Sequence, residues 1–259
     1  MKPDYPYLRA EGLDDARIEV FRRFNACLIE GNARANLTAI TAPEEVEVKH
    51  FLDSLCLRAS KHWREKEGAP HIGSACFKSE ATGDGAEPHH GSARIADVGG
   101  GAGFPGVPLM IADGDFALDV LEASRKKVDF IHLLANELGL IGLGAIHIRA
   151  EDAGRSLLYR ERYDWTLSRG VAATPVLLEY CLPLLKIGGY MAAYKGPAGP
   201  DEAKTAKKAA ALLGGKLIDV VSATLPKEMG ERHILIYRKE RPTPAAYPRK
   251  AGVPAKKPV

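Results

Sequence analysis

The feature that most constrains this chain is a glycine-rich stretch between two apolar runs. Asp97 is followed by glycine at positions 99, 100, 101, 103 and 106, with apolar residues 95–96 before it and 107–111 after it. This order predicts a strand, a tight turn and a helix, because glycine lets the backbone bend sharply and lets a ligand lie against it. The first amides of such a helix also lack partners within the helix. A nucleotide-like ligand is therefore the first expectation.

The turn fits two cofactor motifs. Gly101, Gly103 and Gly106 match the dinucleotide pattern G-x-G-x-x-G, and Glu122 stands about twenty residues on, where a ribose-binding acid belongs. Asp97 and the glycines at 99, 101 and 103 match the acidic-x-G-x-G-x-G turn of methyltransferases that use S-adenosylmethionine (SAM). A carboxylate beside the turn suits the cationic methionine end of SAM, and one at the next strand tip suits its ribose diol. The longer match favours SAM, while purely structural roles for both acids stay open.

Composition is that of an ordinary globular protein. Of the 259 residues, 46% are hydrophobic and 27% are charged, and the formal charge of +3 permits nucleic-acid binding without demanding it. No apolar run approaches the roughly twenty residues of a membrane span, and the start of the sequence carries no secretory segment. The four cysteines (Cys27, Cys56, Cys76 and Cys181) form no C-x-x-C pair, which favours reduced thiols in the cytoplasm over disulfides or a zinc cluster.

The first part of the chain predicts helices followed by an irregular insert. Apolar residues at helical spacing from Leu13 indicate a helix that Gly31 ends. A second helix is expected to start at 41–44, with Thr41 as cap and Glu44 completing a capping box, and to continue with Val46, Phe51 and Leu55 on its apolar face. Residues 1–63 therefore form an N-terminal helical region. Residues 64–93 are rich in Gly, Ser, His and charge and read as a flexible inserted loop. Its His and Cys residues (His71, Cys76, His89 and His90) match no metal template.

Strand and helix patterns then alternate over 94–240, which predicts an α/β doubly wound sheet with right-handed crossovers and helices on both faces. The strands are expected at 94–98, 117–122, 144–149, 164–168, 188–194, 216–224 and 231–238, and the helices at 105–112, 124–138, 151–158, 174–185 and 201–213. Only a short loop separates the last two strands, so they must be antiparallel. Seven strands ending in an antiparallel hairpin are typical of class I SAM-dependent methyltransferases, and no room remains for the catalytic domain of a nicotinamide enzyme. The basic, Pro-rich tail at 241–259 is expected to be disordered.

In such sheets the ligand lies outside the carboxyl ends of the strands. This rule brings residues 97–104, 122–124, 150–152 and 168–169 to one crevice. Glu151 and Asp152 are candidates to receive an adenine amine, with Ala150 giving a backbone contact, although two acids also suit a first helical turn. Phe104 is either a cover for the cofactor or a core aromatic. Arg169 has no apolar reason to stand at a strand end, which favours a functional role.

Several phrases together resemble one family. They are Asn36-Leu37-Thr38-Ala39-Ile40-Thr41, Lys49-His50-Phe51-Leu52-Asp53-Ser54, the turn from Asp97 to Pro108, Glu137-Leu138-Gly139-Leu140, Ser168-Arg169, Lys195-Gly196 and Gly230-Glu231-Arg232-His233. In this combination and order, over about 13–62 and 94–239, the chain resembles the ribosomal RNA small subunit methyltransferase G family, also called GidB. The insert and the basic tail look like additions to the family pattern. Gly100, Glu122 and Gly170 replace the more usual Ser or Thr, Asp and Ala.

The resemblance implies an enzyme that transfers a methyl group from SAM to N7 of guanine 527 in the 530 loop of 16S rRNA. It places the cofactor contacts on Gly99, Phe104, Ala150, Glu151 and Arg169, beside Asp97, Gly101, Gly103 and Glu122 from the motif. Guanine N7 has a lone pair and no proton, so no general base and no catalytic proton-transfer residue are expected. No Asn/Asp-Pro-Pro-Tyr/Phe motif of amino-group methylation follows the fourth strand.

The implied partner is 16S rRNA or the small ribosomal subunit, bound by a monomer without metal or membrane. Loop RNA is gripped by cationic side chains along its phosphates and by contacts to base edges. The candidate RNA contacts are Asn36, Arg125, Lys126, Lys127, Lys195, Arg232 and His233, with His50 as a weaker candidate. A solvated helix face is the alternative for 125–127. Two other functions stay open: a SAM-dependent methyltransferase of another substrate, and a non-catalytic RNA-binding or assembly factor that retains SAM.

Overall fold

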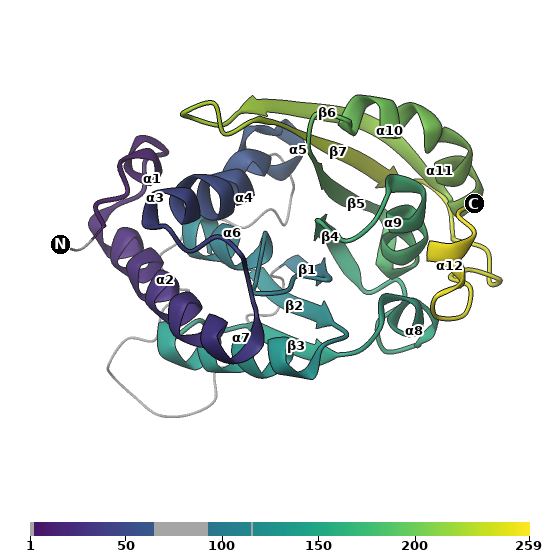
Figure 1. Cartoon of the computed structure of the whole chain (residues 1–259). Helices are drawn as coiled ribbons and strands as arrows, with labels where there is room; N and C mark the ends of the chain where they lie inside the picture. Colours follow the sequence, from purple (N-terminus) through teal and green to yellow (C-terminus); the bar gives the residue numbers. More distant parts are fainter. Residues whose placement is uncertain (1–2, 65–92, 115) are drawn as a thin grey trace.

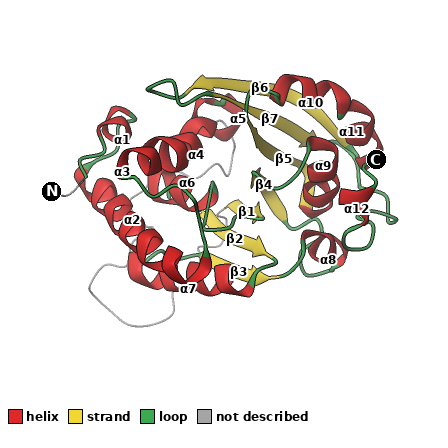
Figure 2. Cartoon of the chain, viewed as in Figure 1, coloured by secondary structure: helices red, strands yellow, loops and turns green. Residues whose placement is uncertain are grey.

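Seven strands form one central sheet in the computed structural model, which describes residues 3–64, 93–114 and 116–259 (Figures 1 and 2). The strands are β1 (Ala93–Val98), β2 (Phe116–Glu122), β3 (Leu143–His147), β4 (Tyr163–Arg169), β5 (Leu185–Lys195), β6 (Gly215–Thr224) and β7 (Glu231–Lys239). Their order in the sheet is β3-β2-β1-β4-β5-β7-β6. The order reverses between β1 and β4, the position at which open α/β sheets bind their ligands.

The first five strands pair in parallel, whereas β7 runs antiparallel to both β5 and β6. The loop at 225–230 is too short for a crossover helix, so β6 and β7 form a hairpin and β7 enters the sheet between β5 and β6. The predicted seven-stranded, mostly parallel sheet is confirmed, and each predicted strand is present with its ends displaced by three residues at most.

Helices cover both faces of the sheet (Figure 2). One face carries α1 (Pro6–Ala10), α2 (Asp15–Ala35), α3 (Pro43–Val46), a π-helical stretch (Glu47–Leu52), α4 (Asp53–Leu55), a 3-10 turn (Cys56–Ala59), α5 (Lys61–Arg64), α6 (Gly106–Asp113) and α7 (Arg125–Leu138). The other carries α8 (Ala150–Arg155), α9 (Thr174–Cys181), a 3-10 turn (Leu182–Leu184), α10 (Gly199–Thr205) and α11 (Lys207–Leu213). The predicted helix at 201–213 is thus two helices with a break at Ala206.

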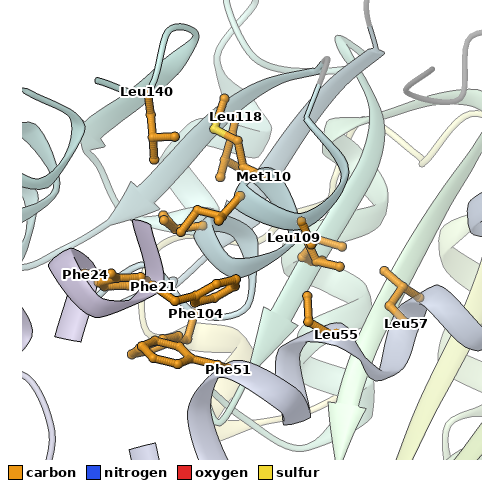
Figure 3. Packing of buried hydrophobic residues seen from close by; sticks show 14 of the residues in the cluster. Phe21, Phe24, Phe51, Leu55, Leu57, Phe104, Leu109, Met110, Leu118 and Leu140 are labelled. Atoms are coloured by element: carbon orange, nitrogen blue, oxygen red, sulfur yellow. The ribbon is translucent and has the colours of Figure 1, made fainter. Parts of the chain in front are cut away.

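Each strand supplies alternate residues to two separate cores. Ile95, Leu118 and Leu167 belong to the core under the N-terminal helices, whereas Ala96 and Leu121 belong to the opposite one. This division follows from the period of two along a strand. The first core contains a cluster of phenylalanines from α2, the π-helical stretch and the glycine turn, which lie against one another in Figure 3. The N-terminal helices and the sheet therefore share one hydrophobic core.

Two details of the N-terminal region correct the sequence expectations. The helix α2 continues through Gly31 to Ala35, because Gly31 permits close packing: a Cβ there would lie 2.7 Å from the ring of Phe130 on α7. The next helix is capped by Ala42 without a side-chain hydrogen bond, so the expected capping box of Thr41 and Glu44 is wrong. The Thr41 hydroxyl is not used to satisfy the free amides.

The structure describes one of the two additions to the family pattern, the tail at 241–259, and almost none of the other, the insert at 64–93. The predicted insert at 64–93, which includes His71, Cys76, His89 and His90, lies almost entirely within 65–92, outside the described residues. Residues 241–259, expected to be disordered, instead pack against α8 and α9 and include a short helix, α12 (Val253–Lys256) (Figure 1). The expectation is wrong because Arg249 pairs with the fully buried Glu179, a long-range contact that composition does not reveal.

Candidate functional site

The glycine turn after β1 has the backbone conformation that its glycines predict. Gly99, Gly101 and Gly103 have φ values of +70°, +58° and +95°, a region that strains residues with a Cβ. A Cβ on Gly99 would lie 2.5 Å from Cγ2 of Val171, so this position also needs glycine for space. On Gly101, by contrast, a Cβ would meet nothing closer than 3.9 Å. The turn is therefore closed at Gly99 and open at Gly101.

Asp97 lies beneath this turn and is fully buried. Its Oδ2 accepts a hydrogen bond of 2.8 Å from the backbone amide of Gly106, at the start of α6. Its Oδ1 is buried and has no hydrogen-bond partner among the described residues. Burial raises the pKa of Asp97 to about 7, against the lowering effects of the Gly106 amide and the Arg169 charge. One oxygen thus stabilises the turn, and the other is an unsatisfied acceptor beside it.

Glu122 ends β2 and holds the other side of the turn. Its Oε2 accepts from the amide of Gly101 at 3.2 Å, and its Oε1 accepts from the amide of Ser124 at 2.9 Å. The carboxylate therefore fixes the open glycine in place and keeps lone pairs available for further donors. The sequence predicted this acid at the strand tip, and the structure places it against the glycine turn.

Phe104 and Arg169 lie together at the boundary with the N-terminal helices. The ring of Phe104 stacks on Phe24 and His50, with centroid distances of 5.3 and 4.5 Å, and Cζ of Arg169 lies 5.0 Å from its centroid (Figure 3 shows Phe24 and Phe104). The ring is buried and belongs to the hydrophobic core. The ring of Phe104 therefore packs as a core aromatic, and its contact with the cofactor stays a prediction.

The guanidinium of Arg169 connects the end of β4 to the N-terminal helices. Its NH1 lies 3.1 Å from Oδ2 of Asp53, and 3.3 to 3.4 Å from the Ser54 hydroxyl and two backbone carbonyls, those of Lys49 and His50. Asp53 is itself buried, and its Oδ1 lies 3.2 Å from Nε of Arg232. Sequence reasoning quoted Asp53 only as part of a family phrase and gave it no role. The sequence around it mixes apolar and charged residues, so no local pattern marks Asp53 as a partner of Arg169.

His50 is held neutral in this cluster. Burial and the charge of Arg169 lower the pKa of His50 to about 4, and its Nε2 lies 2.7 Å from the hydroxyl of Thr38. The Nδ1 atom is buried and has no partner in the described part of the chain. A neutral imidazole stacked on a phenylalanine is a poor partner for phosphate, which weakens the case for His50 as an RNA contact.

The two acids predicted to bind the adenine amine, Glu151 and Asp152, differ in burial. Glu151 is buried in α8, and its Oε1 accepts a hydrogen bond of 2.8 Å from the amide of Gly252 in the C-terminal segment. Asp152 is exposed on the same helix. The structure therefore brings Glu151, but not Asp152, into a defined hydrogen-bonded position next to Ala150.

The side chains predicted to contact RNA lie in different surroundings. Nζ of Lys127 lies 4.0 Å from the position that a Cβ on Gly101 would occupy, beside the open part of the turn. Arg232 joins Arg169 at Asp53. The remaining candidates are Arg125, exposed and paired with Asp129, Lys126 and Asn36, both exposed, and His233, whose Nδ1 lies 2.9 Å from the Ser222 hydroxyl.

Lys195 does not fit the role of an RNA contact. Its side chain is 8% exposed, and its Nζ lies 2.8 Å from both Oε2 of Glu202 and the carbonyl oxygen of Ala172. The lysine stabilises the segment after β4 and is not presented to solvent. The strand pattern could not show this pairing, because it gives no information on a partner in a later helix, and the RNA contact of Lys195 stays an untested prediction.

Neither a metal centre nor a membrane helix is found in the part of the chain that the structure describes. No three His, Cys, Asp or Glu residues there are grouped to bind a metal ion. Among the described helices, none has both the length and the apolar character needed to cross a bilayer.

Comparison with known proteins gives consistent matches. The family described as rRNA small subunit methyltransferase G matches residues 85–235. The curated protein named ribosomal RNA small subunit methyltransferase G from Alkaliphilus oremlandii is 41% identical over 96% of this chain and 95% of its own length. Its namesakes from Desulforamulus reducens and Exiguobacterium sp. are 40% and 41% identical, over 92% and 97% of this chain and 89% and 96% of their own lengths.

Proposed function

Because this chain belongs to the rRNA small subunit methyltransferase G family, we propose that it methylates N7 of guanine 527 in the 530 loop of 16S rRNA. The class of activity, SAM-dependent methylation of small-subunit rRNA, follows from family membership and the fold. The atom and the nucleotide are the proposal. One observation carries the proposed SAM site: the open glycine, Gly101, lies between a buried acid and a strand-end acid where the strand order of the sheet reverses.

The residues around the turn fit SAM in charge and shape. We propose that Glu122 accepts hydrogen bonds from the ribose diol, since its two oxygens are already positioned by the amides of Gly101 and Ser124. The unsatisfied Oδ1 of Asp97 is an acceptor beside the turn for the cationic methionine end, and Asp97 adds negative charge there above its pKa of about 7. Gly99, Gly101 and Gly103 give the backbone surface, Phe104 anchors the end of the turn, and Ala150 and Glu151 form the adenine wall.

When bound, SAM supplies a methyl group on a positively charged sulfur. The chain has to hold guanine N7 in line with that methyl group, and no side chain is needed to remove a proton because N7 carries none. We propose that Arg169 organises this edge through Asp53 and the backbone of the N-terminal helices. Because N7 has no proton to lose, we assign no general base.

RNA is proposed to approach over the basic residues beside the turn. Arg125 and Lys126 are exposed at the start of α7, and Lys127 extends toward Gly101. Cations of this kind neutralise phosphates, while the base itself enters the site. Arg232 and His233 at the start of β7, with the exposed Asn36, complete the proposed contact set. We place this activity in the cytoplasm of the cell, where its ribosomal substrate is, and propose that the chain acts as a monomer.

The test uses purified protein, labelled SAM and three substrates prepared from cells that lack the modification: naked 16S rRNA, mature 30S subunits and an assembly intermediate. Label in at least one of these, followed by chemical cleavage specific for 7-methylguanine at position 527, is the expected result. Glu122→Ala should lose SAM binding by calorimetry and serves as the site control. Label on another nucleotide, or on no RNA at all, would refute the proposal.

A further inference from the structure

The C-terminal segment 241–259 lies against the face of the sheet that carries α8 and α9 (Figure 1). Its anchor is Arg249, whose side chain and backbone amide make four hydrogen bonds of 2.6 to 3.2 Å to the carboxylate of Glu179. Glu179 is fully buried. A buried carboxylate with a bidentate arginine is a specific attachment, because removing Arg249 leaves the charge of Glu179 unpaired in the core.

The same segment supplies contacts along the length of α8. The amide of Gly252 donates to Oε1 of Glu151 at 2.8 Å, and NH1 of Arg155 donates to the carbonyl of Pro248 at 3.3 Å. Gly154 packs so closely on Pro248 that a Cβ there would lie 2.8 Å from its ring. One turn further on, NH1 of Arg160 donates to the carbonyls of both Gly154 and Tyr247, each at 2.8 Å.

A helix of six residues is too short to be stable by itself, so α8 depends on what packs against it. Glu151 in its first turn is restrained twice: by the Gly252 amide and by the hydroxyl of Tyr180, whose pKa is raised to about 12 by burial and by the Glu151 carboxylate. The position of Glu151, and of Ala150 before it, is therefore set partly by a residue about a hundred positions later in the sequence.

We propose that segment 241–259 is a positioning element for the cofactor site, which holds the wall formed by Ala150 and Glu151 and thereby sets the affinity for SAM. This inference rests on the proposed function, because it requires these two residues to contact the cofactor. Docking of the segment and binding of SAM then favour each other, and such coupling is reciprocal. Bound SAM should strengthen docking of the segment on α8 and α9, and loss of the segment should lower the affinity of the protein for SAM.

The sharpest variant ends the chain after Lys250. It removes the Gly252 amide and α12 but leaves the Arg249–Glu179 attachment intact. The dissociation constant for SAM, measured by calorimetry, should rise about tenfold, while KM for RNA stays unchanged because the basic residues at 125–127 are untouched. Lys250→Ala is the matched control: its side chain is exposed and makes no ion pair or hydrogen bond in the described part of the chain.

A second measurement uses the intact protein and does not depend on any variant folding. The segment offers trypsin sites after Arg249, Lys250 and Lys256. If docking and SAM binding are coupled, saturating SAM should slow cleavage after these residues severalfold, without an equal effect on cleavage after the exposed Lys208 of α11.

The outcomes are distinct. Unchanged SAM affinity in the shortened chain, or cleavage rates after Arg249, Lys250 and Lys256 that SAM does not alter, would overturn the positioning role while leaving the proposed function standing. Failure of the wild-type chain to bind SAM at all would instead refute the proposed function.

Discussion

Asp97 is a residue at which stability depends on pH in an unusual direction. Its pKa is raised from 3.8 to about 7, so the folded state holds this proton over a pH range in which the unfolded chain has lost it. The contribution of the protonated group to stability is complete below about pH 4 and is lost as the pH rises through 7. An uncharged amide at this position can still accept the hydrogen bond from Gly106.

We therefore expect Asp97→Asn to stabilise the unliganded protein progressively with pH. The difference in free energy of unfolding between the variant and the wild type should grow by about 2 kcal/mol between pH 5 and pH 8, as measured by urea denaturation. The same variant should bind SAM more weakly at pH 8, because it lacks the negative charge. Asp152→Asn, an exposed neighbour of the site, is the control. If the difference in free energy of unfolding between Asp97→Asn and the wild type does not change with pH, burial does not raise the pKa of Asp97.

Alanine substitutions at Gly99 and Gly170 can distinguish the cost of a strained backbone conformation from the cost of a steric clash. Both glycines have φ of +70°, but a Cβ on Gly99 would lie 2.5 Å from Val171, whereas a Cβ on Gly170 would meet nothing within 4 Å. Gly170→Ala should cost about 1 kcal/mol of stability, and Gly99→Ala about 1 to 3 kcal/mol more. Adding Val171→Ala to Gly99→Ala should recover that excess in urea denaturation. Equal costs for the two single substitutions would show that the close approach at Gly99 is relieved elsewhere.

At the scale of elements, the strands, the glycine turn and the antiparallel hairpin could be predicted because their signals are local. Alternation, helical spacing and loop length act within a few neighbouring residues, which fixes β1 and the hairpin of β6 and β7. The contacts that complete the site are not local: Arg169 meets Asp53 across 116 positions and Gly252 meets Glu151 across 101. A single sequence shows both partners of such a pair but not their proximity.

Arg169 shows what such a contact does. Sequence reasoning gave it a functional role, and the structure places it between β4 and the helices that precede the insert. Its partner Asp53 has a side chain only 6% exposed, so removing the arginine leaves that carboxylate with Arg232 alone. Loss of activity in an Arg169 variant would therefore reflect displaced N-terminal helices as well as a changed site.

We expect Arg169→Met to destabilise the protein by about 3 kcal/mol, because it breaks a buried ion pair while keeping similar length. Hydrogen exchange should accelerate more at residues 47–55 than in β2 and β3, which lie away from Arg169 at the β3 end of the sheet and respond only through global unfolding. Asp53→Asn combined with Arg169→Met should cost less than the sum of the two single changes. Uniform acceleration over the whole sheet would contradict a local linking role.

Over the whole molecule, the N-terminal helices and the C-terminal segment both contact residues at the carboxyl ends of the parallel strands. The N-terminal helices reach the ends of the strands through Asp53 and Arg169 on one face, and the C-terminal segment reaches them through Gly252 and Glu151 on the other. The glycine turn lies between these two attachments, and its basic neighbours at 125–127 remain accessible to a large ligand. The charge of +3 is modest, so RNA binding has to depend on where the cations stand rather than on their number.

This arrangement predicts different outcomes for two lysines that sequence reasoning treated alike. Lys126→Ala removes an exposed charge at the start of α7 and should lower the slope of log affinity for 16S rRNA against log salt by about 1, with stability and SAM binding unchanged. Lys195→Ala leaves Glu202 without its buried partner and should lower the unfolding free energy by about 2 kcal/mol before any RNA is added. Lys208→Ala, on α11, should change neither quantity. A Lys126→Ala protein with an unaltered salt dependence would remove the start of α7 from the RNA-binding surface.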